Sequence, residues 1–212
     1  MPMLNEKVMQ DVTKALASMQ KAVTLKLFTQ ALECKQCQET HQMLEELIAA
    51  NSLLKLEVYT FESDTEAVES LKIDKIPAIA IVGEKDYGIR FYGIPAGYEF
   101  SSLLSAILMV STGVVKLTND TKTFLDNLQK PVHMQVFVTP TCPYCPPAVM
   151  LAHQMAFYSK NVIAEMVEIS AYPHLAQKYS VQGVPRTVIN EKWYVEGAAP
   201  EAMLINKIKE GI

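Results

Sequence analysis

The stretch 139-TPTCPYCPP-147 is the most informative part of the chain, because it places a C-x-x-C pair directly after a run of branched and aromatic residues. The chain has four cysteines, and the other two repeat the same spacing in 31-ALECKQCQET-40. In a reducing compartment such pairs are more often catalytic or metal-binding than structural. The four thiols are therefore expected to carry out redox chemistry or to bind a metal.

The chain repeats itself at a common distance. The two C-x-x-C pairs lie 108 residues apart, and so do Pro77 in 73-IDKIPAIAIV-82 and Pro185 in 181-VQGVPRTVIN-190. Both halves thus carry C-x-x-C followed by a branched apolar residue and proline. This common order indicates a tandem duplication.

Hydrophobic periodicity predicts the same order of elements in each half. The first half is expected to contain helices over 5–20, 37–50, 66–72 and 99–110, with strands over 23–29, 55–61 and 77–82 and one further strand. The second half is expected to contain helices over 119–129, 145–160, 174–180 and 200–210, with matching strands that include 162–169 and 185–190. The first two strands of each half should pair in parallel and the last two should form an antiparallel hairpin.

The predicted fold class is α/β, with two tandem units that are each a mixed four-stranded sheet flanked by helices. A boundary fits in 112-TGVVKLTND-120, where a helical pattern ends at Gly113 and a new N-cap follows. The expected units are residues 1–116 and 117–212.

The composition of the chain argues against nucleic acid and membranes as partners. A formal net charge of −4 and a pI near 5.6 offer no basic surface for nucleic acid. The apolar run 103-LLSAILMVSTGVV-115 falls short of the roughly 20 residues of a membrane span, so it is interpreted as a buried helix. The first twenty residues do not read as a secretory signal, and a cytoplasmic location is expected.

These patterns resemble known families. A C-x-x-C that opens a helix, with a proline about forty residues later at the head of a strand, resembles the thioredoxin fold. The duplication, together with 142-CPYC-145, resembles the glutaredoxin-like protein disulfide oxidoreductases, which are tandem thioredoxin-fold proteins. The stretch 86-DYGIRFYGIPAGYEFSSLL-104 also resembles the N-terminal region of the alkyl hydroperoxide reductase flavoprotein, where usually one half alone keeps its C-x-x-C. Because both pairs are intact here, the first family is favoured.

Thiol-disulfide exchange needs an attacking thiolate and a second thiol that resolves the mixed disulfide. Cys34 and Cys142 should lie at a helix start, where unpaired amides and the helix dipole favour negative charge. They are the predicted nucleophiles, and Cys37 and Cys145, one turn deeper, are the predicted resolving cysteines.

The prolines of the second pair suggest an irregular helix start. If Cys142 is the N-cap, Pro143 suits the first turn, whereas Pro146 and Pro147 would remove intrahelical bonds and bend the helix. The resemblance further implies that Ile76-Pro77 and Val184-Pro185 are cis bonds that bind substrate through the main chain of Ile76 and Val184.

The two sites are not expected to be equivalent. Glu33 and Lys35 flank Cys34 and act on its pKa in opposite directions, while Cys142 has no charged neighbour. The hypothesis is that the reduction potentials differ and that the C-terminal site dominates protein disulfide turnover.

Other polar residues are open to two interpretations. His41 and His153 lie one and two turns after a cysteine and could relay a proton, although a partly exposed helix histidine is the simpler interpretation. Glu57 and Glu168 could be a buried acid beneath a disulfide, but solvation at a strand end explains them equally well. None of these is counted as a site residue.

The predicted function is that of a protein dithiol-disulfide oxidoreductase that reduces, forms or isomerises protein disulfides. It needs no bound cofactor or metal, and a flavin-dependent disulfide reductase is the expected electron donor. One alternative is a dedicated electron carrier between such a reductase and a peroxidase. Another is a metal-binding scaffold protein, although the two pairs are far more distant than the roughly 15–20 residues of a zinc ribbon.

Overall fold

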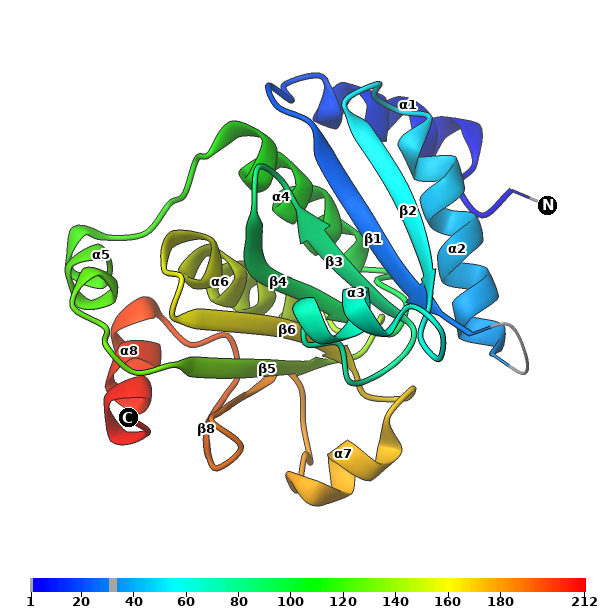
Figure 1. Ribbon diagram of the computed structural model, residues 1–212. Coiled ribbons are helices and arrows are strands. Elements are labelled where there is room, and N and C mark those ends of the chain that lie inside the picture. Colours follow the sequence, from blue (N-terminus) through cyan, green and yellow to red (C-terminus); the bar gives the residue numbers. More distant parts are fainter. Residues whose placement is uncertain (1, 31–33) are drawn as a thin grey trace.

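The computed structural model describes residues 2–30 and 34–212 and places them in one sheet with helices on both faces (Figure 1). The elements of the first half are α1 (Glu6–Leu16), β1 (Val23–Thr29), α2 (Lys35–Ile48), β2 (Leu54–Thr60), α3 (Thr65–Ser70), β3 (Ala78–Val82), β4 (Asp86–Tyr92) and α4 (Glu99–Thr112). Those of the second half are α5 (Asn119–Asp126), β5 (Val132–Val138), α6 (Cys145–Tyr158), β6 (Val162–Glu168), α7 (Pro173–Lys178), β7 (Arg186–Ile189), β8 (Trp193–Glu196) and α8 (Glu201–Glu210).

The two halves have the same strand connectivity. β1 pairs with β2 in parallel and with β3 antiparallel, and β3 pairs with β4 antiparallel. β5 to β8 repeat this pattern. The predicted mixed four-stranded arrangement of each unit is confirmed.

The way in which the halves join was not predicted. β4 pairs in parallel with β6, so the strand order is β2-β1-β3-β4-β6-β5-β7-β8 in a single sheet (Figure 1). β4 and β6 are buried along most of their length, which is typical of strands covered on both faces. The outer strand β2 instead exposes Lys55 and Glu57, and such charges protect a free edge.

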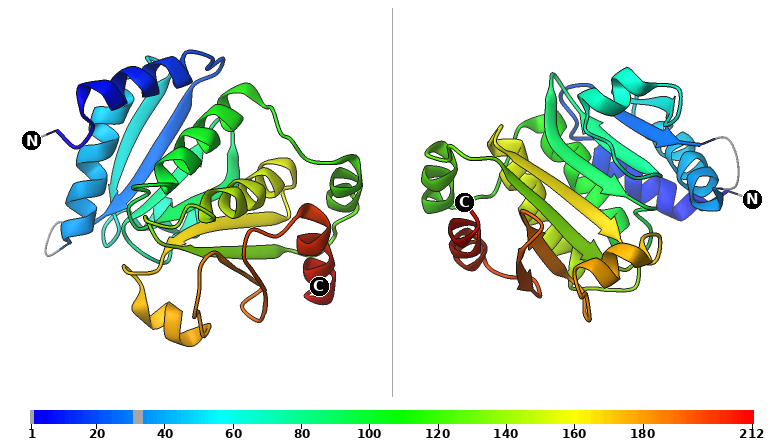
Figure 2. Two further views of the ribbon diagram at one scale, coloured as in Figure 1. Left: turned by 180° about the vertical axis from the view of Figure 1, so that it is seen from behind. Right: turned by 60° about the horizontal axis from the view of Figure 1, so that its bottom comes forward.

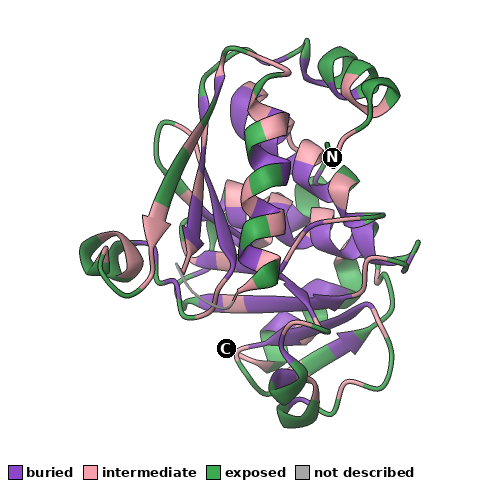
Figure 3. Cartoon of the chain, turned by 90° about the vertical axis from the view of Figure 1, so that its right-hand side faces the viewer, coloured by how far each residue is buried: buried purple, intermediate pink, exposed green. Residues whose placement is uncertain are grey.

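The sheet separates two apolar cores. Side chains alternate between its faces, so Ile79 and Ile81 of β3 enter one core while Ala78 and Ala80 enter the other. The larger core lies under α2, α4 and α6, which Figure 2 shows in front of the sheet in its left view. The smaller core lies under α3 and α7, and buried residues concentrate in the strands between these layers (Figure 3).

Helix α4 contains the apolar run that was interpreted as a buried helix. Leu103, Ala106 and Ile107 are all buried, which confirms that interpretation. Among the helices in the described residues, none is long and apolar enough to cross a membrane.

Helix α1 ends earlier than the predicted residue 20. Its last helical residue is Leu16, and the Ser111 hydroxyl of α4 accepts the amides of Gln20 and Lys21 at 2.9 and 3.0 Å. Those amides bond to a side chain distant in sequence instead of continuing the helix.

The segment between the halves follows α4. Gly113 caps this helix with a φ of 74°, in the left-handed region that favours glycine. Thr118 caps α5, and its hydroxyl accepts the amide of Thr121. The division after residue 116 falls between these two caps and stays a prediction.

Candidate functional site

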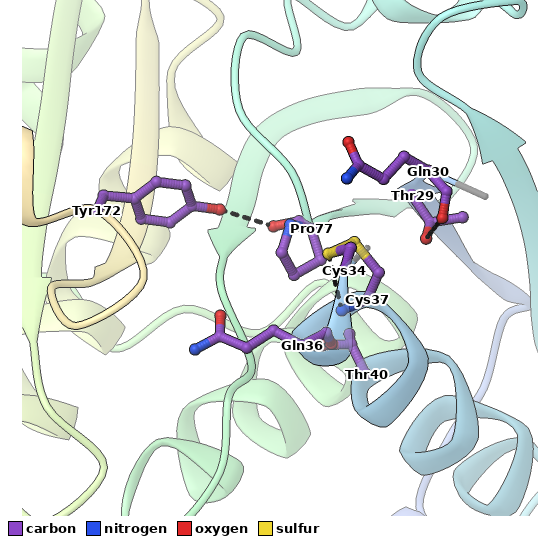
Figure 4. The surroundings of a disulfide bond; sticks show 8 residues. All are labelled: Thr29, Gln30, Cys34, Gln36, Cys37, Thr40, Pro77 and Tyr172. Carbon is purple, nitrogen blue, oxygen red and sulfur yellow. Dashed lines mark hydrogen bonds between the residues drawn. A yellow bond between two sulfur atoms is a disulfide. The ribbon is translucent and has the colours of Figure 1, made fainter. Parts of the chain in front are cut away.

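The N-terminal pair has the geometry of a helix-capping cysteine. Cys34 is the N-cap of α2, and its Sγ accepts the amide of Cys37 at 3.1 Å (Figure 4). A disulfide joins the two residues. Cys34 is partly exposed, whereas Cys37 is only 1% exposed. An N–H that already points at Cys34 Sγ would also stabilise a thiolate there.

Two charged residues, Glu33 and Lys35, flank Cys34 in the sequence. Glu33 lies outside the described residues. Lys35 is exposed and its Nζ lies 3.5 Å from Glu39 Oε1, one turn along α2. The ammonium group is therefore paired along the helix.

The C-terminal pair departs from the prediction. Its helix α6 begins at Cys145 with Tyr144 as the N-cap, so the placement of Cys142 at the N-cap is wrong. Pro146 and Pro147 consequently fall in the first turn, where amides have no intrahelical partner and proline removes no bond. The predicted bend has no cause here. A disulfide joins Cys142 and Cys145, of which the second is fully buried.

Both X-Pro bonds that the sequence singled out lie in the cis form. The carbonyl of Pro77 accepts the amide of Gly93 at 2.9 Å, and Figure 4 shows the Pro77 ring beside the first disulfide. In the second half, Cys142 Sγ lies 3.7 Å from the carbonyl oxygen of Val184. The structure thus brings the residue before Pro185 into contact with the second disulfide.

The structure gives each histidine a partner other than a cysteine. His41 lies on α2 with Nε2 3.4 Å from Glu45. His153 is 1% exposed, so the expectation of a partly exposed residue is wrong. Its Nε2 donates to the carbonyl of Arg90 at 3.3 Å, and burial lowers the pKa of His153 to about 3. This neutral side chain packs edge-on against Phe91, in the core between α6 and β4.

The two acidic candidates have local roles. The carboxylate of Glu168 accepts the amides of Ser170 and Ala171 at 2.9 and 3.1 Å. Glu57 lies on the exposed edge strand, where hydrogen bonding from Tyr59 holds its pKa below the usual value. Neither is a free acid beneath a disulfide.

A different carboxyl group, that of Glu99, was not predicted. Glu99 begins α4, is 1% exposed, and burial raises its pKa to about 7 despite the nearby Ser102 hydroxyl. The amide of Tyr98 donates to the carbonyl of Pro140 at 3.0 Å, which ties this helix start to the turn before Cys142. Its signal in the sequence is the position of Glu99 on the same helical face as the buried residues that follow.

A cluster of buried charged side chains lies on the face of the sheet that α3 and α7 cover, opposite the face that packs against α4. Lys75 Nζ lies 3.3 Å from Glu165 Oε2, and Glu165 Oε1 lies 2.8 Å from His133 Nε2. Burial lowers the pKa of His133, but the hydrogen bonds and charges of Glu165 and Glu191 outweigh it and raise the value overall. This cluster joins the loop before Pro77 to the second half.

The His, Cys, Asp and Glu side chains can be compared with the arrangement that a metal ion needs. In the segments 2–30 and 34–212, there is no group of three or more His, Cys, Asp or Glu side chains that could hold a metal ion. Within the same segments, both cysteine pairs are joined as disulfides and no cysteine is free.

Comparisons with known proteins agree with this geometry. A family described as the thioredoxin domain matches residues 132–210. A protein disulfide oxidoreductase from Aeropyrum pernix K1 superposes with a TM-score of 0.91 at 32% identity, covering 98% of this chain and 93% of that one. The alkylhydroperoxide reductase AhpF from Enterococcus faecalis gives 0.89 at 27% identity, over 96% and 98% of the two chains.

Longer proteins also contain a similar segment. An NADH dehydrogenase from Bacillus subtilis is 26% identical over 147 residues, which are 68% of this chain and 29% of that protein. An alkyl hydroperoxide reductase from Staphylococcus aureus is 27% identical over 124 residues, 58% of this chain and 24% of the relative. The chain therefore spans less than a third of the length of these curated relatives.

A thioredoxin-like fold in each half, with a disulfide-linked C-x-x-C in both, places this chain in the class of tandem thioredoxin-fold proteins. The identity and coverage of the Aeropyrum pernix protein extend this likeness over nearly the entire chain. The chain belongs to the protein disulfide oxidoreductase family.

Proposed function

We propose that the chain exchanges electrons with protein disulfides through two dithiol sites, with Cys34 and Cys142 as nucleophiles. The thiolate attacks a substrate disulfide, forms a mixed disulfide and releases one substrate thiolate. Cys37 or Cys145 then attacks its partner, releases the second substrate thiolate and closes the intramolecular disulfide. Two electrons pass to the substrate, and the reverse sequence oxidises a substrate dithiol.

The observation that carries this assignment is the unequal burial within each pair. Cys37 and Cys145 are 1% and 0% exposed, whereas Cys34 is partly exposed and Cys142 is 8% exposed. An attacking thiolate needs access to the substrate, while a resolving thiol reaches only its neighbour. This order of burial favours the first cysteine of each pair as the nucleophile.

We assign substrate binding to Ile76 and Pro77 at the first site and to Val184 and Pro185 at the second. The contact between Cys142 Sγ and the Val184 carbonyl, 3.7 Å long, supports this role. A substrate that pairs with the main chain there would have its disulfide within reach of the cysteine.

The two sites differ in how the first cysteine of each pair is placed. Cys34 is the N-cap of α2 and its Sγ accepts the amide of Cys37, whereas α6 begins only at Cys145 and Cys142 precedes it. The two sites should therefore differ in reduction potential, with the C-terminal site dominant in protein disulfide turnover.

A second candidate function is electron transfer from a flavin-dependent disulfide reductase to a peroxidase. The likeness to the alkyl hydroperoxide reductases favours it. Rapid turnover with one reductase and one peroxidase, combined with poor reduction of insulin disulfides, would support this carrier role over general disulfide exchange.

The remaining assignments follow from the same features. A cytoplasmic location is proposed, because the four cysteines form two C-x-x-C pairs and none is left over for a structural disulfide between distant parts of the chain. Residues 1–116 and 117–212 are proposed as the two units, because the caps at Gly113 and Thr118 bracket this division.

A redox titration tests the proposed function. The parent and single Cys→Ser variants at positions 34 and 142 would be equilibrated in glutathione and dithiothreitol buffers, with free thiols then alkylated and counted. Two resolvable dithiol couples are expected, each lost in one variant. Thiols that stay unreactive until a chelator removes metal would refute the proposal and favour a scaffold, and equal loss of turnover in both variants would refute the dominance of the C-terminal site.

A further inference from the structure

The carbonyl group of Pro77 is held from both halves of the chain. It accepts the amide of Gly93 at 2.9 Å and the hydroxyl of Tyr172 at 3.1 Å. Tyr172 is 95 residues distant in sequence and lies after β6 in the second half. Figure 4 shows its ring reaching across to Pro77, beside the Cys34–Cys37 disulfide.

The surroundings of Tyr172 fix its position. The side chain is 5% exposed, and its ring stands edge-on to Tyr92 at a centroid distance of 6.5 Å. At Gly93, where φ is 81°, an added Cβ would lie 2.8 Å from Glu168 Cβ of the second half. The two halves are therefore in close contact at this point, and the hydroxyl of Tyr172 has little freedom to leave Pro77.

The loop before Pro77 has a second anchor in the second half. Lys75 Nζ lies 3.3 Å from Glu165 and 3.8 Å from the centroid of the Tyr92 ring. The side chain of Lys75 is 9% exposed, so this ion pair is largely shielded from water and salt.

The equivalent loop of the second half is held differently. Pro185 has the matching main-chain bond, from the amide of Gly197 at 2.8 Å. No side-chain donor to the Pro185 carbonyl is present in the part of the chain that the structure describes. The position that matches Lys75 at the 108-residue offset is Gly183, which has no side chain to form an ion pair. Side-chain support of the proline loop from the other half is thus particular to the first site.

We propose that Tyr172 is a positioning residue for the first redox site, although it belongs to the second half of the chain. Its hydroxyl orients the peptide group that follows Pro77, and this sets how Ile76 meets an extended substrate beside Cys34. The proposal rests on the substrate-binding role proposed for Ile76 and Pro77. It predicts that binding of a peptide at the first site depends on the second half, whereas the second site is independent of Tyr172.

The test uses full-length chains that keep one active pair each. Cys142→Ser/Cys145→Ser leaves the first site, and Cys34→Ser/Cys37→Ser leaves the second. Each reduced protein is mixed with a disulfide-containing peptide in a single turnover, and thiol loss is followed by quenching and alkylation. The peptide concentration is varied to separate half-saturation from maximal rate. A small aromatic disulfide, which needs no main-chain pairing, serves as the second probe.

Tyr172→Phe is then placed in both backgrounds, with Tyr179→Phe as the matched control. Tyr179 also lies on the α7 side of the sheet, and its hydroxyl accepts a hydrogen bond from Gln135 at 3.3 Å, whereas the hydroxyl of Tyr172 donates to Pro77. Tyr172→Phe should raise the half-saturating peptide concentration at the first site about three- to tenfold, the size expected for one lost hydrogen bond. Tyr172→Phe should not change the half-saturating peptide concentration at the second site, nor the rate at which either site reacts with the small disulfide. Tyr179→Phe should change none of these quantities at either site.

Each outcome separates the inference from the proposed function. If Tyr172→Phe leaves the half-saturating peptide concentration at the first site unchanged, or changes it equally at both sites, the role of Tyr172 is overturned while the proposed function stands. A slower reaction with the small disulfide as well would assign Tyr172 a general structural role and also overturn the inference. Failure of the parent first site to react with the peptide, while it reacts with the small disulfide, would overturn the substrate-binding role and the inference together.

Discussion

Replacement of Glu99 by glutamine should change how the stability of the protein depends on pH. The carboxyl group is 1% exposed, and burial raises its pKa from 4.5 to about 7. Each pKa unit corresponds to about 1.4 kcal/mol, so ionising this group in the folded protein costs about 3 kcal/mol. The dipole at the start of α4 favours the ionised form by about 2 kcal/mol at most, and burial is therefore the larger effect.

The sign follows from proton linkage. Between pH 4.5 and about pH 7 the folded protein holds a proton on Glu99 that the unfolded chain has released. The free energy of unfolding of the parent must therefore fall as pH rises through this window. Glu99→Gln has no proton to lose, so the difference in stability, variant minus parent, should grow by about 3 kcal/mol from pH 4.5 to pH 8.

Urea unfolding of the oxidised protein at several pH values would measure this difference. Comparing pH values cancels the constant cost of burying an amide in place of a carboxyl group. Glu66→Gln is the matched control, because Glu66 lies in the first turn of α3 and is exposed. A stability difference for Glu99→Gln that stays constant across the pH range would refute the assignment of a raised pKa.

Three further substitutions probe contacts that join distant parts of the chain. Ser111→Ala removes two accepted bonds and one donated bond to the segment before β1, and should lower the urea midpoint by the equivalent of about 2–3 kcal/mol. Gly97→Ala puts a Cβ against the Pro140 carbonyl oxygen, well inside van der Waals contact, at a φ of 59°, and should cost at least about 2 kcal/mol. Calorimetry that finds a melting temperature equal to that of the parent would contradict this clash. In His133→Gln, the protonated imidazole beside Glu165 is lost; burial lowers the pKa of His133, but its carboxylate partners raise it overall. The parent should therefore lose stability relative to this variant as pH rises through the folded-state pKa, and parallel pH profiles would refute it.

The repeated fold could be predicted because its signals are local. C-x-x-C at a helix start, a proline at a strand start and period-two alternation in β3 each depend on a few neighbouring residues. Because the same signals recur in both halves at an offset of 108 residues, each half supports the interpretation of the other. The start of α6 was misplaced for the same reason, since Pro143 and Pro146 both suit a first helical turn and the sequence offers no choice between them.

Residues whose surroundings depend on how the chain packs could not be predicted in this way. Glu99 reads as an ordinary acidic residue in a first helical turn until its burial is known. Tyr172 reads as an aromatic core residue, and no periodicity connects it with Pro77. His153 was expected at the surface because a helical position alone does not say which neighbouring element covers it.

Local patterns within each half were enough to predict the duplicated α/β fold, the two cysteine pairs and the two prolines, because hydrophobic period and thiol spacing depend on neighbouring residues. The pairing of β4 with β6, the bond between the start of α4 and the turn before Cys142, and the support of Pro77 by Tyr172 are visible only in the folded chain. They could not be predicted because strand-edge pairing, burial and side-chain hydrogen bonds depend on which surfaces meet when the two halves pack together.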